Sequence, residues 1–471
     1  MLVDVTALLF TSGTLGSVAE AFGVHENNYS ASSAATPGHR VNAPLLGSIA
    51  APSVSPAEVP SYLLAASPGT AASSAELSAL TGTSFLRQLS LLPQTNIAAF
   101  VSAHPEAISA ILAAPPAATE VSGWWTGLQE AERQSMATAA PQLVGNLDGI
   151  PSVVRGAANA TWLQQSIQSL KDQIASASGR AVTESSERQV HMLDEIGGTL
   201  AKNTDGPPRS LLSIDSTGQG RAAVVLGNLD TADYVTYLIP GMFFTVDGQI
   251  NDWTDDAADL YAEQVEWVNR LAETDSAMRD KTVAVVSWMG YETPNLTNIG
   301  SLDLAVKGRD EIARAIEGLQ AARESSEPRI TIVAHSYGST AALMALTDYS
   351  FEIDGLAVIG SPGSAAQSVD DLHVRNKNVY VGKAAWDPVP NSSFFGSDPG
   401  SASYGAKTLY VGGGVDPITG KELAASIGHN GYFGAPDLEA TRNLALLGIG
   451  HSELITDGTE DASKTLMALK D

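Results

Sequence analysis

The sequence predicts an α/β fold: a mostly parallel, doubly wound sheet with an antiparallel hairpin at one edge, preceded by an α-helical N-terminal region. Three observations support this. Residues up to about 203 are rich in Ala, Ser and Leu with helical spacing of apolar positions. Beyond the breaker cluster at 203–208, short β-branched runs alternate with helical stretches. One such run, 330–333, leads directly into a serine flanked by small residues and then into a helix.

The helical region comes first in the 471-residue chain, which is long enough for two domains. We place a helical N-terminal domain at 1–203 and a sheet domain at 204–471, and 36–60, rich in Pro, Ser and Ala, resembles a linker. Residues 158–202 are predicted to form one or two long helices. Their apolar stripe, which includes Leu163 and Ile167, is expected to pack in the core.

The strands follow in order after the breaker cluster. The first two should form the edge hairpin, and a helix over 257–271 should separate the third strand from the fourth. The eight predicted strands are Ser210–Asp215, Arg221–Leu226, Tyr234–Ile239, Thr282–Trp288, Ile330–Val333, Leu356–Ile359, Asn378–Val381 and Thr408–Val411. In such a sheet, a site is expected at the carboxyl ends of the strands.

The composition excludes several classes of function. The chain has 52 acidic and 26 basic residues, a net charge of −26, so it should repel nucleic-acid backbones. It has no cysteine, which excludes disulfides and thiolate chemistry. We expect no membrane span and no secretion signal, which favours a cytoplasmic location, with non-classical export left open.

The serine after 330–333 is the predicted nucleophile. Ser336 stands between Ala334 and Gly338, two residues away on either side, and both are small enough for strand and helix to approach closely. The turn should also bring the Tyr337 N–H to a helix N-terminus, where it can stabilise an oxyanion.

The general base should follow the serine and the acid in the chain. Three histidines come after Ser336. His373 precedes a strand and should lie at the wrong end of the sheet, whereas His429 lies in a Gly-rich loop after the last strand. We therefore predict His429 as the base, with His451 in reserve.

The acid should lie just beyond a strand end. Asp387, in Trp386-Asp387-Pro388, follows the strand at 378–381 and is the predicted acid, with Asp398 and Asp416 as weaker alternatives. An Asp-Pro turn with no catalytic role would give the same pattern.

The second oxyanion donor should come from the loop after 234–239, where Pro240-Gly241 permits a tight turn. The N–H of Met242 or of Phe243 could donate. Aromatic residues in loops on this side suggest an apolar acyl or aromatic pocket, and the tentative pocket residues are Phe243, Phe244, Trp386 and Tyr432. No metal ion or organic cofactor is expected, and the Gly-rich run 412–414 is interpreted as a turn.

Several unusual segments resemble an actinobacterial α/β-hydrolase family of largely uncharacterised function, with a G-H-S-Y-G elbow. The segments are Trp124-Trp125-x-x-Leu128, 144–151, Ala158-Asn159, 237–242, 287–291, the elbow at 334–338 and 360–363. The resemblance spans about 123–435, implies an α/β-hydrolase fold behind a helical region, and departs from the family at Ala334. We interpret 146–149 as structural.

The predicted function is hydrolysis of a small-molecule carboxylic ester with an apolar acyl or aromatic group, through Ser336, His429 and Asp387. Two alternatives stay open. One is a serine amidase or peptidase with the same three residues. The other is a non-catalytic binding or export-linked protein that keeps the fold.

Overall fold

The computed structural model describes residues 74–176, 179–202, 206–390 and 392–459, and all of them belong to one compact unit, Ser73–Asp471. The linker predicted at 36–60 lies outside the described residues, and the domain boundary at 203 stays a prediction.

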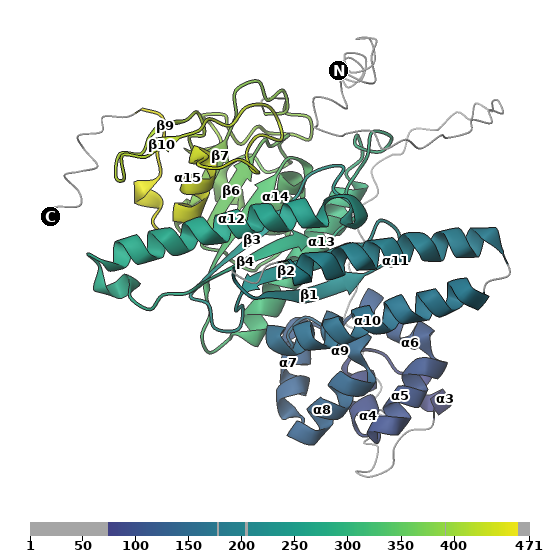
Figure 1. The fold of residues 1–471 in the computed structure, drawn as a ribbon. Coiled ribbons are helices and arrows are strands. Elements are labelled where there is room, and N and C mark those ends of the chain that lie inside the picture. The colour runs from purple at the N-terminus through teal and green to yellow at the C-terminus, as the bar shows by residue number, and fades with distance from the viewer. Residues whose placement is uncertain (1–73, 177–178, 203–205, 391, 460–471) are drawn as a thin grey trace, which may run out of the picture. The chain divides into compact units, whose positions relative to one another are not determined.

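The helical region consists of short helices followed by a long pair (Figure 1). The pair, α10 and α11, confirms the helices predicted over 158–202, and Leu163 and Ile167 are buried as expected. The helices are α3 (Ser74–Ser78), α4 (Gly82–Ser90), α5 (Gln94–Ala103), α6 (Pro105–Ala113), α7 (Ala118–Gly127), α8 (Glu130–Ala139), α9 (Pro141–Asn146), α10 (Ser152–Ser176) and α11 (Arg180–Ala201). Among the described helices none alone is long and apolar enough to cross a membrane. The bent pair α5–α6 reaches the required length and composition only together.

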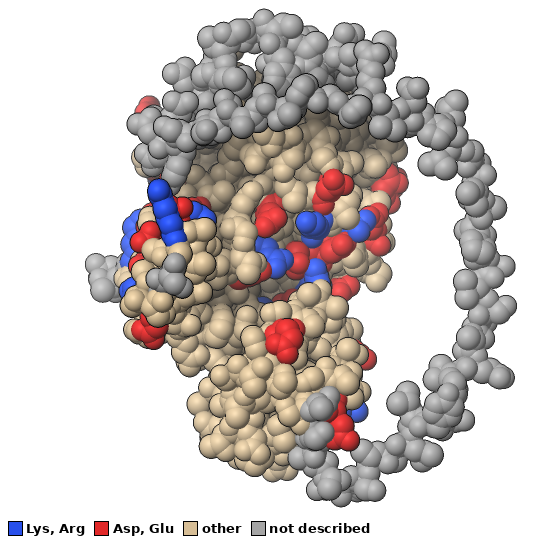
Figure 2. All heavy atoms as spheres, turned by 90° about the vertical axis from the view of Figure 1, so that its right-hand side faces the viewer, with Lys and Arg blue, Asp and Glu red and all other residues tan. Residues whose placement is uncertain are grey.

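The short helices carry few charges. Between residues 88 and 129 the sequence has only two charged side chains, Glu106 and Glu120. In Figure 2 the lower part of the molecule, formed by these helices, is accordingly almost uncharged, whereas acidic and basic side chains are interspersed above it. The acidic excess of the described chain therefore lies mainly on the sheet domain.

The sheet has eight strands in the order β1-β2-β4-β3-β5-β6-β7-β8. β1 and β2 form an antiparallel hairpin at one edge, β2 pairs antiparallel with β4, and the pairs from β4 to β8 are parallel. The predicted fold class is thus confirmed. The strands are β1 (Arg209–Asp215), β2 (Arg221–Gly227), β3 (Tyr234–Ile239), β4 (Val283–Met289), β5 (Arg329–His335), β6 (Gly355–Ile359), β7 (Val379–Gly382) and β8 (Lys407–Thr408), with a separate hairpin of β9 (Gly414–Val415) and β10 (Glu422–Leu423).

Helices cover both faces of the sheet. On one face α10, α11, α12 (Val246–Ala272) and α15 (Glu439–Gly448) bury apolar side chains against the strands. On the other face α13 (Asp303–Ala322) and α14 (Tyr337–Asp348) do the same. Since strands β2 to β7 are covered on both sides, their apolar residues run almost without interruption, which is typical of a buried sheet.

Two predicted boundaries were wrong. The strand predicted at 408–411 is shorter, because the Tyr410 N–H donates to the Thr456 carbonyl instead of continuing the ladder. The helix predicted at 257–271 begins at Val246. Its first half is rich in aspartate, and these charges obscure a buried stripe that includes Ile250 and Trp253.

Two asparagines of the helical region bond to the edge strand β1. The Asn146 side-chain oxygen accepts from the Ile214 N–H at 2.8 Å, and the Asn159 amide donates to the carbonyls of Leu211, at 3.0 Å, and Gly145, at 2.8 Å. The strand is irregular between Leu211 and Ser213. These contacts give the segments around Asn146 and Asn159 a structural role, in agreement with the interpretation of 146–149.

Candidate active site

Ser336 stands at the sharp turn between β5 and α14, at the N-terminal end of the helix. Its backbone has φ 54° and ψ −129°, a strained conformation for a residue with a side chain. The Ser336 N–H donates to the Ile359 carbonyl at 2.9 Å, which fixes the turn against β6. The side chain is thus presented at the carboxyl end of the parallel strands, as the sequence predicted.

Glycines let the neighbouring loop reach the serine. A Cβ atom added to Gly241 would lie 2.5 Å from Ser336 Cβ and 3.0 Å from its Oγ, and one added to Gly338 would lie 2.2 Å from the Pro240 carbonyl oxygen. The distances of 2.5 Å and 2.2 Å are too short for a Cβ atom at either position. The loop 240–242 therefore lies in direct contact with the elbow because both positions are glycine.

His429 lies between Ser336 and Asp387. Its Nε2 is 2.7 Å from Ser336 Oγ, and its Nδ1 is 2.9 Å from Asp387 Oδ1. All three residues are buried, with exposed fractions of 3% for Ser336, 2% for His429 and 7% for Asp387. Because the carboxylate can only accept, Nδ1 carries the proton, which leaves the Nε2 lone pair to accept from the serine hydroxyl. The structure thus brings together the three residues predicted to act together.

Three donors surround the carboxylate of Asp387. Besides His429, the Tyr432 hydroxyl donates to Oδ2 at 2.6 Å and the Val389 N–H donates to Oδ1 at 2.9 Å. Burial raises the pKa of Asp387, but the hydrogen bond from His429 and the charge that His429 carries when protonated, with the bonds from Tyr432 and Val389, outweigh it and hold the pKa below its usual value. The carboxylate therefore stays ionised beside the imidazole.

The tentative pocket residues lie in different places. Tyr432 is fully buried, and its hydroxyl also accepts from the Ala384 N–H at 2.8 Å. It contacts Asp387 and does not line the cavity described next. Trp386 is 89% exposed. Phe244 lines a cavity of about 410 Å³, whose lining does not include Phe243. The loop sequence could not distinguish these outcomes, because each depends on contacts with distant segments.

The alternative acids and histidines have other partners. Asp416 is paired with Arg442, and Asp398 accepts from the Gly400 N–H within a turn. His451 contacts Glu453, and His373 bonds to the Tyr349 carbonyl.

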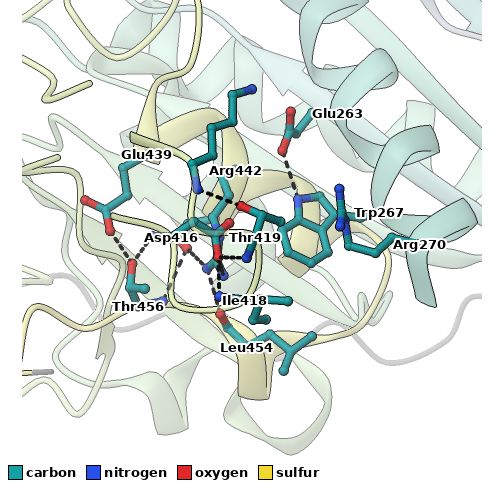
Figure 3. A network of polar contacts seen from close by, with 12 residues as sticks. Glu263, Trp267, Arg270, Asp416, Ile418, Thr419, Glu439, Arg442, Leu454 and Thr456 are labelled. Atoms are coloured by element: carbon teal, nitrogen blue, oxygen red, sulfur yellow. Dashed lines mark hydrogen bonds and ion pairs between the residues drawn. The ribbon is translucent and has the colours of Figure 1, made fainter. Parts of the chain in front are cut away.

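A buried polar network holds the segments on either side of the His429 loop (Figure 3). Arg442, on α15, bonds to Asp416 at 3.1 Å and to the Leu454 carbonyl at 2.7 Å, and Thr456 donates to Glu439 at 2.6 Å. Arg442 and Asp416 are 1% and 2% exposed. Since β9, β10 and α15 flank the loop in the chain, this network fixes both of its ends.

Hydrogen bonding distinguishes the Met242 and Phe243 N–H groups, the two candidates for a second oxyanion donor. The Phe243 N–H already donates to the Pro294 carbonyl at 3.0 Å. In the part of the chain that the structure describes, neither the Met242 N–H nor the Tyr337 N–H has a protein acceptor. Of the two candidates in this loop, Met242 therefore has the free donor.

Sequence reasoning missed His335. It is 3% exposed, its Nε2 lies 2.8 Å from the His429 carbonyl, and the two rings are 4.8 Å apart. Burial, then the neighbouring His429, lowers the pKa of His335 to about 3, so it is neutral at ordinary pH. Its place directly before Ser336, at the end of a buried strand, was the available signal. Within the described ranges no three His, Asp or Glu side chains are grouped to hold a metal ion.

Comparison with known proteins shows similarity to one protein family and to mycobacterial proteins. Residues 215–397 match the model of an α/β hydrolase family, a span that includes Ser336 and Asp387 but not His429. An uncharacterized protein of Mycobacterium tuberculosis is 28% identical over 389 residues, which cover 73% of this chain and 58% of that protein. An uncharacterized protein of Mycobacterium bovis is 27% identical over 233 residues, which cover 48% of this chain and 84% of that protein.

Among solved structures, an S-formylglutathione hydrolase from Agrobacterium tumefaciens is similar at 10% identity with a TM-score of 0.32, covering 54% of this chain and 98% of that one. A carboxyl esterase from Tuber melanosporum is similar at 12% identity with a TM-score of 0.32, covering 54% and 90%. The chain spans about 58% of the length of the M. tuberculosis relative. The match over residues 215–397, the strand order and the mycobacterial relatives make the chain similar to α/β hydrolases and to uncharacterized actinobacterial proteins.

Proposed function

We propose that the protein is a serine hydrolase that cleaves carboxylic esters through an acyl-enzyme. The observation that carries the proposal is the continuous hydrogen-bonded relay from Asp387 through His429 to Ser336, with distances of 2.9 and 2.7 Å. A serine is a weak nucleophile unless a base takes its proton, and a buried carboxylate that orients that base is the arrangement this chemistry needs.

In the first step, His429 Nε2 takes the hydroxyl proton as Ser336 Oγ attacks the ester carbonyl carbon. The carbonyl oxygen becomes an oxyanion, which accepts from the N–H groups of Tyr337 and Met242. Removing one such donor typically costs about 3 kcal/mol of transition-state stabilisation. Asp387 stays ionised, holds the imidazole in the required tautomer and stabilises its charged form.

Collapse of the intermediate breaks the bond to the alkoxy oxygen, which leaves as the alcohol with the proton from His429. Water then attacks the acyl-enzyme, and His429 takes its proton and returns it to Ser336 Oγ as the carboxylic acid departs. The strained backbone of Ser336 presents Oγ to both steps without rearrangement of the turn.

The substrate we propose is a small-molecule ester with an apolar acyl or aromatic group. The aromatic side chains near the site support this, since Phe244 and Phe433 line the cavity beside it and Phe395 packs against Tyr337 with ring centroids 5.4 Å apart. An amidase or peptidase would use the same relay, so parallel assays on esters and on matched p-nitroanilides separate the two.

The test is hydrolysis of p-nitrophenyl esters from acetate to palmitate, combined with labelling by a fluorophosphonate. The intact protein should turn over esters and be labelled, and Ser336→Ala should lose both. Ser403→Ala, which alters an exposed serine elsewhere, should keep both. An intact protein that neither hydrolyses any ester nor reacts at Ser336 would replace the proposal with the binding-protein alternative.

A further inference from the structure

Exposed apolar side chains gather on the segments next to the proposed catalytic residues. Ten large apolar side chains are exposed in the part of the chain that the structure describes, and half of them lie on only three segments, 293–302, 384–397 and 423–436. We call these five residues the apolar rim. They are Leu296, Leu302, Trp386, Phe394 and Ile427.

Two members of the apolar rim lie beside the acid and the base. Ala385 pairs with Ile427 in a short parallel bridge, which sets the segment of Trp386 alongside the segment of Ile427. Trp386 directly precedes Asp387, and Ile427 lies two residues before His429. These two exposed side chains therefore flank the pair of residues that bond to each other in the site.

The other members lie on segments that contact the elbow. Phe394 packs against Phe395 with ring centroids 4.8 Å apart, and Phe395 packs against Tyr337 at 5.4 Å. The Tyr337 hydroxyl also donates to the carbonyl of the residue before Leu302, at 2.7 Å, and Leu296 belongs to the same segment. All five members of the apolar rim are thus on segments in contact with the proposed active site.

The segments of the apolar rim carry almost no charge. In a chain in which 17% of the residues are charged, 293–302 and 423–436 contain no Asp, Glu, Lys or Arg, and 384–397 contains only the buried Asp387. Lys383 borders the last segment and lines a different cavity. A surface of this composition suits contact with an uncharged, apolar partner.

Trp386 is held in a conformation that costs stability. It is the third residue of a turn in which the Asp387 N–H donates to the Ala384 carbonyl at 3.3 Å, and its φ is 64°. Glycine or asparagine is favoured at such a position, and a bulky side chain there is an outlier. Because Trp386 is 89% exposed, packing within the described residues returns little of this cost. The strained turn and the exposed indole together indicate a contact outside the fold.

We propose that the apolar rim docks on the surface of a lipid without net charge, and that the substrate is a neutral lipid ester taken from that surface. Indole rings favour the boundary between lipid and water. The net charge of −26 opposes an anionic membrane, and the rim segments lack the Lys and Arg side chains that bind anionic headgroups.

The position of the apolar rim favours a lipid over a protein partner. A protein seated on these segments would cover the surroundings of Ser336, whereas a lipid surface itself supplies the ester. The identity of the substrate rests on the proposed hydrolase function, but docking of the rim does not.

Docking is tested by flotation of the full chain carrying Ser336→Ala, which prevents hydrolysis of the lipid. The protein should float with vesicles of phosphatidylcholine and dioleoylglycerol in physiological salt. It should bind at least about tenfold more weakly when phosphatidylglycerol replaces the dioleoylglycerol, because the acidic protein is then repelled.

Two variants of the apolar rim separate docking from folding. Trp386→Asn suits the positive φ, so the free energy of unfolding should stay the same or rise, while vesicle binding should fall about tenfold or more. Ile427→Ser should also weaken binding. Leu91→Ser is the matched control, since Leu91 is 59% exposed and Ile427 63%, but Leu91 follows α4, outside the rim segments, and its loss should leave binding unchanged.

Several results would overturn docking on uncharged lipid. These are equal binding to the anionic vesicles, equal binding by Ile427→Ser and Leu91→Ser, and no flotation with either kind of vesicle. A dimer in solution that Trp386→Asn converts to a monomer would show that the rim covers a second copy of the chain, and this too would refute the proposal.

The source of the substrate is tested by the rate on emulsified tributyrin divided by the rate on dissolved p-nitrophenyl butyrate, which share one acyl group. This ratio should fall about tenfold in Trp386→Asn and stay constant in Leu91→Ser. An unchanged ratio in Trp386→Asn refutes the lipid surface as the source. Hydrolysis of dissolved esters without vesicle binding refutes docking alone, whereas vesicle binding without hydrolysis of any ester refutes the hydrolase proposal and leaves docking intact.

Discussion

Replacing Tyr432 with phenylalanine removes one oxygen atom that makes two buried hydrogen bonds. The hydroxyl donates to Asp387 at 2.6 Å and accepts from the Ala384 N–H at 2.8 Å. A hydrogen bond to a charged group contributes about 1.5–3 kcal/mol, and a neutral one about 1 kcal/mol. Since the residue is fully buried, water cannot replace either bond, and we expect the free energy of unfolding to fall by about 2–4 kcal/mol.

The chain contains a matched control. Tyr404 is 1% exposed, and among the described residues its hydroxyl is buried without a hydrogen-bond partner. Tyr404→Phe removes the same atom from a similar environment but breaks no bond, so the free energy of unfolding should stay the same or rise slightly. The difference between the two variants therefore isolates the two bonds of Tyr432.

The assay is equilibrium unfolding in urea at pH 7 and at lower pH. Asp387 has a lowered pKa in the folded protein, so its contribution to stability is present above the unfolded value of about 3.9 and is lost as pH falls through the lower folded value. The gap between Tyr432→Phe and the parent protein should thus be largest near pH 7 and narrow below about pH 4. If Tyr432→Phe and Tyr404→Phe shift the unfolding midpoint equally, the reasoning is refuted.

Three further outcomes are expected. Gly241→Ala should lower kcat/KM for p-nitrophenyl esters about 100-fold, because the new Cβ would lie 2.5 Å from the Cβ of Ser336, the proposed nucleophile. The Cβ of Gly300→Ala would meet nothing within 4 Å, so this control variant should keep the kcat/KM of the parent protein. Equal kcat/KM values for the two variants would refute the close approach. Arg442→Met should reduce the free energy of unfolding by about 3–5 kcal/mol by leaving Asp416 buried without its partner, and adding Asp416→Asn should restore part of the loss. Because the pKa of His335 is lowered to about 3, only the unfolded chain binds a proton at this residue between about pH 6.5 and 3. The free energy of unfolding should therefore fall on acidification by up to about 1.4 kcal/mol per pH unit more in the parent protein than in His335→Gln. Equal changes with pH in the two proteins would contradict this.

The central strands were predictable because their signal is local. The bounds of β3 agree with the predicted strand at both ends, and β5 and β6 differ by at most two residues at either end. These strands are buried on both faces, so their apolar runs are unbroken and end where the chain leaves the sheet. The order of Ser336, Asp387 and His429 along the chain was also informative, because each of them follows a strand.

The surroundings of these residues could not be predicted, because they depend on contacts between distant segments. Tyr432 and Trp386 are both aromatic residues in loops, yet one is fully buried against Asp387 and the other is 89% exposed. Nothing in either local sequence indicates which way its loop folds. The start of α12 was missed for a different reason, since its aspartates reduce the apolar signal on which helix prediction depends.

The contacts of Asn146 and Asn159 with β1 have a consequence for association. An edge strand with free N–H and C=O groups can recruit a strand from another chain and begin aggregation. Here two side-chain amides from the helical region occupy such groups at Ile214 and Leu211. The asparagine amides thus bond to the edge of β1 as a neighbouring strand would, but they present no further strand edge to solvent. Loss of the helical region should therefore expose the edge of β1 and promote self-association.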